Sequence, residues 1–157
     1  MTEVLARVRV PVLCISTVLA AIVIHETGHA VAGYLAGGHV REVVFLSVRP
    51  HVSMNGLFTR GATAWTAAAG SSSMFLAWAL WVLIAGSGPG WRASVRAFSL
   101  MAFVEACGWF LSSLLFPLGP RSEDGWTFLE QSAIHPGWSA LIAFVVGALR
   151  VTVVPRG

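Results

Sequence analysis

Long apolar stretches dominate this chain and restrict what it can fold into. Of its residues, 56% are hydrophobic and only 11% are charged, a balance that excludes an ordinary soluble domain. Backbone groups in lipid must be bonded within the chain, so an all-α membrane protein is expected: one integral domain over 1–157, with about four transmembrane helices in a single bundle. The four stretches that are long enough to cross a bilayer lie at 10–36, 62–86, 93–116 and 136–154.

All ten basic residues are arginines, and they are spread singly along the chain. Scattered arginines are typical of anchors beside membrane spans, whereas a nucleic-acid interface needs a basic patch. We therefore expect the lipid bilayer as a partner and no nucleic acid. More arginines lie on the side of the membrane where the first span begins than on the side where it ends, which favours cytoplasmic termini. The first side has Arg7, Arg9, Arg92, Arg96, Arg150 and Arg156, and the second has Arg41, Arg49, Arg60 and Arg121.

The first apolar stretch contains a cluster of ionisable residues, in the run His25-Glu26-Thr27-Gly28-His29. Two histidines four residues apart lie on one face of a helix, so both imidazoles can reach one metal ion. The glutamate beside His25 can then deprotonate a water molecule at that metal. Ionisable side chains inside an apolar span are costly and usually functional, which favours metal binding over a metal-free polar cluster.

The segment between the first two spans predicts a short β-hairpin near residues 43–59. Val44, Leu46 and Val48 alternate with other side chains, and Asn55-Gly56 is a strong signal for a hairpin turn. We expect the hairpin to lie against the membrane where the first span ends. The second span opens with small residues at 67–73, which would allow another backbone to come close.

A catalytic zinc site usually has three protein ligands, and the two histidines supply two of them. The first and third spans run in the same direction, so the residues that follow each of them share one leaflet. Glu105 lies mid-span, about half a bilayer from the histidines, and we expect serine or tryptophan neighbours to satisfy it. Asp124 is followed by Gly125, which would let the backbone bend so that the Asp124 carboxylate points inward. The candidates for the third ligand are Asp124, Glu123, His135 and Glu105.

Four segments of the chain together resemble the site-2 protease family of intramembrane zinc metalloproteases. His25-Glu26-Thr27-Gly28-His29-Ala30 matches the HExGHA form of that family, and Ala69-Gly70-Ser71-Ser72-Ser73 resembles the small-residue motif on its second core helix. The predicted hairpin resembles the membrane-associated β-strands of the family. The segment from Pro117 to Gly125 resembles the proline-rich segment, closing in Asp-Gly, that supplies the third zinc ligand. Phe116 and Glu123 stand where the common form has Asn and Leu.

The resemblance implies an enzyme, a zinc metalloendopeptidase that hydrolyses peptide bonds in or near transmembrane segments of other membrane proteins. Zn²⁺ would be held by His25, His29 and Asp124, with Glu26 as the general base. It further implies a minimal core without a PDZ domain, embedded as a multi-pass protein in the cytoplasmic membrane of a bacterium. Its site would face the cytoplasm, opposite to the side that the arginine distribution favours.

Two other functions fit the same residues. The altered second and third motifs are compatible with a catalytically inactive, zinc-binding membrane scaffold that binds helices without cleaving them. A metal-transport element is the third hypothesis, and it is the weakest because about four spans and one ligand cluster are few for a transporter. Neither the substrate nor the oligomeric state follows from the residues.

Overall fold

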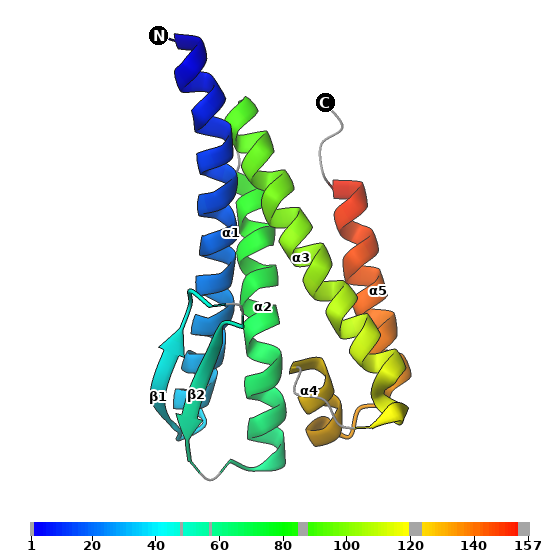
Figure 1. Ribbon diagram of the computed structural model, residues 1–157. Helices are drawn as coiled ribbons and strands as arrows, with labels where there is room; N and C mark the ends of the chain where they lie inside the picture. The colour runs from blue at the N-terminus through cyan, green and yellow to red at the C-terminus, as the bar shows by residue number, and fades with distance from the viewer. Residues whose placement is uncertain (1, 48, 57, 85–87, 120–123, 154–157) are drawn as a thin grey trace.

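The computed structural model describes residues 2–47, 49–56, 58–84, 88–119 and 124–153. A short 3₁₀ turn at Phe116–Leu118 follows the third helix. Figure 1 shows α1, α2 and α3 as the long elements, with α5 beside α3. The predicted all-α fold with a hairpin after the first helix is confirmed. The elements are α1 (Thr2–Leu35), β1 (His39–Val44), β2 (His51–Asn55), α2 (Arg60–Ile84), α3 (Pro89–Leu115), α4 (Asp124–Ser132) and α5 (Pro136–Val153).

Three of the predicted spans are helices long and apolar enough to cross a membrane, namely Val8–Leu35, Arg60–Ile84 and Gly90–Leu118. The fourth predicted span is α5, whose apolar part Pro136–Ala148 is shorter. Large hydrophobic side chains are exposed along all of these helices, as a bilayer requires of the lipid-facing surface. The chain is therefore an integral, multi-pass membrane protein.

Helices α1 and α2 pack closely because glycine and other small residues line their contact. A Cβ atom at Gly28 would lie 2.6 Å from the carbonyl oxygen of Ala69 and 2.6 Å from Oγ of Ser73. Such distances are well inside van der Waals contact, so only glycine fits at this position of α1. The small residues at 67–73 thus allow the close approach that the sequence predicts.

The half of the bundle toward the N-terminus of α1 is packed shut, and we call it the closed half. Its core consists of Ala21, Met74, Phe98 and Ala102, contributed by α1, α2 and α3. Hydroxyl groups add polar links between the same helices. Thr17 Oγ1 lies 2.7 Å from Ser94 Oγ, and the indole N–H of Trp81 donates to Ser94 Oγ at 3.0 Å.

The hairpin is present, but its predicted boundaries and turn are wrong. Strands β1 and β2 pair antiparallel from His39 with Asn55 to Val44 with His51, so the chain reverses between Val44 and His51 and not at Asn55-Gly56. The cause lies at the end of α1, where Gly37 has φ +87° and lets the chain turn directly into β1. Gly56, with φ +155°, instead leads the chain out of β2.

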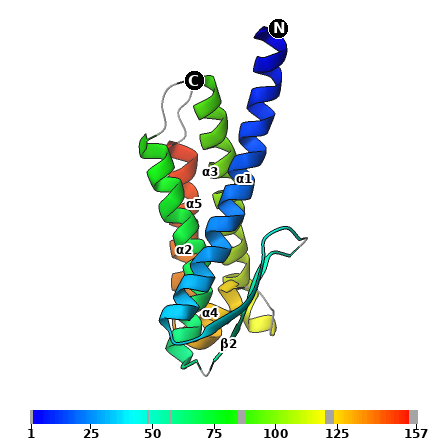
Figure 2. The same ribbon diagram turned by 90° about the vertical axis from the view of Figure 1, so that its left-hand side faces the viewer.

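Figure 2 shows the hairpin crossing the ends of the helices and projecting to one side. Helix α4 lies at the same end of the bundle and packs against both α2 and α3. The sequence predicted an acidic turn here, whereas Asp124 is the first residue of a helix. The shared direction of α1 and α3 does bring the histidine motif, the hairpin and α4 to one end, as predicted.

Candidate metal centre

The histidine motif lies near the C-terminal end of α1, inside the first candidate span. His29 and Glu26 are buried, with 8% and 6% of their surfaces exposed. His25 and His29 are one helical turn apart, and their ring centroids are 4.8 Å from each other. The two Nε2 atoms approach to 3.1 Å, so both rings present the same nitrogen to one point.

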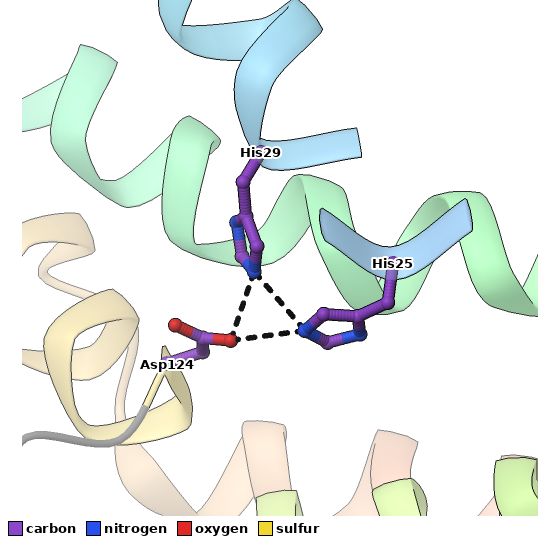
Figure 3. Close-up of side chains that lie close together, drawn as sticks. All are labelled: His25, His29 and Asp124. Atoms are coloured by element: carbon purple, nitrogen blue, oxygen red, sulfur yellow. Dashed lines mark hydrogen bonds and ion pairs between the residues drawn. The ribbon is translucent and has the colours of Figure 1, made fainter. Parts of the chain in front are cut away.

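Asp124 completes the group from the other end of the sequence. Its Oδ2 atom lies 3.0 Å from His29 Nε2 and 3.3 Å from His25 Nε2. Figure 3 shows the three side chains pointing toward one another, with Asp124 projecting from the first turn of α4. Burial raises the pKa of the Asp124 carboxyl, but its hydrogen bonds with His25 and His29 lower that pKa by more. The net result is a pKa well below the usual range of an aspartate.

These three residues can hold a metal ion, since their ligand atoms all lie within 4.8 Å of one another. Among the described residues no other histidine, cysteine or carboxylate belongs to the group. Two imidazole nitrogens and one carboxylate oxygen are a donor set used by divalent transition metals in proteins. The sequence had left four candidates for the third ligand, and the structure brings Asp124 to the histidines.

Helix α2 shapes the back of the site. The Nδ1–H group of His29 donates to the backbone carbonyl of Thr66 at 2.7 Å, so in the neutral ring the lone pair of Nε2 is available to a metal ion. A Cβ atom at Gly70 would overlap His29 Nε2 and lie 2.8 Å from His25 Nε2. Gly70 therefore allows the backbone of α2 to lie directly against both imidazoles.

The prediction that Glu105 lies far from the histidines is wrong. Its Oε1 atom is 4.0 Å from His25 Nδ1. The two helices run in the same direction, and about 25 Å of helix precedes each residue, counted from Pro89 to Glu105 in α3 and from Val8 to His25 in the first candidate span, so both lie at a similar depth. The expected serine and tryptophan partners are present: the Ser71 hydroxyl and the Trp109 indole N–H both donate to Glu105 Oε1.

His135, a further sequence candidate, does not join the group. His135 is exposed before α5, where its Nδ1 accepts a hydrogen bond from the backbone N–H of Gly137 at 3.1 Å. Glu123 falls outside the described residues.

An open cavity of about 730 Å³ surrounds the metal group and gives it access to water. Glu26 lines this cavity together with His25, His29 and Asp124. The hairpin forms another wall, through residues that include Arg49 and His51. Sequence reasoning missed these two as site residues, because a turn placed at Asn55-Gly56 gave no means of telling which hairpin residues face the helices.

Comparisons of this chain with protein-family models, curated proteins and solved structures found no match. Its resemblance to site-2 proteases therefore rests on the four motifs quoted above and stays a prediction. The metal group stands on its own geometry, which does not depend on that resemblance.

Proposed function

We propose that this protein is an intramembrane zinc metalloprotease that hydrolyses peptide bonds in or near the transmembrane segments of other membrane proteins. One observation carries the proposal. Two imidazoles from α1 and a carboxylate from α4 converge beside Glu26, inside a candidate membrane span and on a cavity open to water. Burying ionisable groups this deep in an apolar span costs free energy, and such groups usually have a function.

The spacing of the three ligand atoms supports zinc as the metal. A tetrahedral zinc ion with bonds of about 2.0–2.1 Å keeps neighbouring ligand atoms about 3.3 Å apart. The three separations here are 3.0, 3.1 and 3.3 Å. Three protein ligands would leave one position for water or substrate, which is the arrangement of catalytic zinc rather than structural zinc.

Glu26 has the position of a general base. It is next to His25 in sequence, it is buried, and it lines the cavity that the metal group faces. When bound, zinc supplies Lewis acidity that activates water for attack on a carbonyl carbon. Glu26 would accept the proton that the water loses and pass it to the leaving amine.

The hairpin is the part of the site suited to hold a substrate. A helix has its amides bonded internally, so a transmembrane substrate must unwind before a peptide bond can be attacked. In the described chain β1 and β2 form a two-stranded sheet, which leaves each strand an outer edge for pairing. An unwound segment that adds to such an edge is recognised through its backbone, with little demand on its sequence.

The decisive test of this function is cleavage by purified protein reconstituted in lipid. A set of single-span helical proteins serves as the probe, each incubated with enzyme alone, with a zinc chelator, and with chelator followed by excess Zn²⁺. We expect cleavage within or near the span, its loss with chelator, and its return with zinc. Cleavage that survives the chelator would contradict a zinc-dependent reaction. A protein that binds zinc but cleaves none of the probes would support the zinc-binding scaffold instead.

A further inference from the structure

We propose that Glu105 is a positioning residue that orients the His25 imidazole for the metal. This inference rests on the metal centre of the proposed function, and it assigns a task to a carboxylate that the proposed chemistry leaves unused. Glu105 is contributed by α3, a helix that supplies none of the three ligands.

The two ring nitrogens of each histidine face in different directions. Both Nε2 atoms converge on Asp124, so both Nδ1 atoms face away from it. For His29 the Nδ1 partner is the Thr66 carbonyl at 2.7 Å. For His25, Nδ1 faces Glu105 Oε1 at 4.0 Å. Metal-binding histidines commonly donate their second ring N–H to a carbonyl or a carboxylate, and this site has one of each.

The Glu105 carboxylate is itself held in place by two hydrogen-bond donors. The Ser71 hydroxyl on α2 and the Trp109 indole N–H on α3 both donate to Oε1, the latter at 3.1 Å. Ser71 is almost completely buried, and the Trp109 ring packs against Phe128 of α4 at a centroid distance of 5.3 Å. Three helices thus fix the oxygen that faces His25.

The distance of 4.0 Å is an ion-pair contact and exceeds a direct hydrogen bond. At this separation the negative carboxylate still favours a proton on Nδ1 of His25. That tautomer leaves the lone pair on Nε2, the nitrogen that faces the metal group. Loss of such an outer partner typically lowers metal affinity by about 10–100-fold.

Glu105 also links α2 to α3, so the test must separate positioning from helix packing. In Glu105→Gln the amide oxygen can still accept from Ser71 and Trp109, while the negative charge beside His25 is gone. Glu105→Ala removes both, and Ser71→Ala keeps the carboxylate but removes one of its donors. Glu130→Gln is the matched control, because Glu130 is an exposed carboxylate on α4 outside the cavity lining.

The experiment measures zinc affinity of the detergent-solubilised full chain by competition with a chromophoric chelator, alongside the visible spectrum of the Co²⁺-substituted protein. Thermal unfolding reports whether each variant is folded. We expect Glu105→Ala to bind zinc about 10–100-fold more weakly at unchanged stoichiometry, with an altered cobalt spectrum. Glu105→Gln should unfold like the wild type yet also lose affinity, and Ser71→Ala should lose less. Glu130→Gln should match the wild type.

Three results would overturn the inference. Wild-type affinity in both Glu105 variants would leave Glu105 as a packing link between helices, without affecting the proposed function. No zinc bound by Glu105→Gln even at saturating zinc would make Glu105 a ligand rather than a positioning residue. Wild-type protein that binds no zinc would remove the metal centre itself, and with it both proposals.

Discussion

The two ends of the helix bundle are built from the same helices but packed in opposite ways. In the closed half, Ala21, Met74, Phe98 and Ala102 bring α1, α2 and α3 into direct contact. At the other end, which we call the site half, a cavity of about 730 Å³ lies between the helices and the hairpin, and its lining includes three histidines and three carboxylates. The closed half is filled by packed, mostly apolar side chains, whereas the site half is open and lined by ionisable side chains.

The difference arises from what lies beside α1 and α2 at each end. In the closed half their neighbour is α3, tied to them through Thr17, Trp81 and Ser94. In the site half the short helix α4 packs against α2 and α3, and the hairpin covers another side. A short helix can deliver Asp124 to the histidines without filling the space around them. The closed half thus supplies rigidity, and the site half keeps room for water and substrate.

The largest effect we predict comes from a single carboxylate of the site half. Glu26→Gln should lower the cleavage rate by about 10²–10⁴-fold, because the amide cannot accept the proton that water loses. Zinc content and thermal stability should match the wild type. The measurement is single-substrate cleavage together with zinc per protein, with Glu130→Gln, an exposed carboxylate on α4 outside the cavity lining, as the control. Undiminished cleavage by Glu26→Gln would mean that another group is the base.

The second effect tests how closely α2 must approach the metal group. Gly70→Ala would place a Cβ against both Nε2 atoms, so we expect at least a tenfold loss of zinc affinity. Gly61→Ala is the control, because a Cβ there meets nothing within 4 Å. Chelator competition measures both variants. Equal affinity in the two would show that the imidazoles can move away from α2 at little cost.

The smallest effect belongs to the closed half. Ser94→Ala removes the partner of Thr17 and of the Trp81 indole, so the free energy of unfolding should fall by about 1 kcal/mol. Zinc affinity should not change, because Ser94 does not line the cavity. Unfolding in a graded mixture of denaturing and mild detergent gives the stability, and chelator competition gives the affinity. A parallel loss of zinc would mean that the two halves are not independent.

The spans and the histidine motif could be predicted because both depend on local sequence. A long apolar run specifies a membrane helix by itself, and His25 and His29 share a helix face through their spacing alone. The small residues of α2 at 67–73 likewise predicted a close helix contact. None of these inferences needs knowledge of how distant segments meet.

The errors concern the depth and pairing of segments. A mid-span position in sequence does not place Glu105 far from His25, because the depth of each residue depends on how α1 and α3 lie beside each other, and about 25 Å of helix precedes both. Asn55-Gly56 predicts a hairpin turn from local sequence, but this pair leads out of β2, and the early turn at Gly37 determines where β1 starts. Arg49 and His51 escaped notice for the same reason, since a strand register decides which residues face the cavity.

The central claim is that His25, His29 and Asp124 form one zinc site across α1 and α4. The most direct test is zinc per protein in the wild type and in Asp124→Ala, both purified in mild detergent and measured by elemental analysis after equilibration against limiting zinc. The account predicts about one zinc in the wild type, as expected for a single site with three protein ligands, and little or none in the variant. A wild type without zinc, or a variant that retains as much zinc as the wild type, would contradict it.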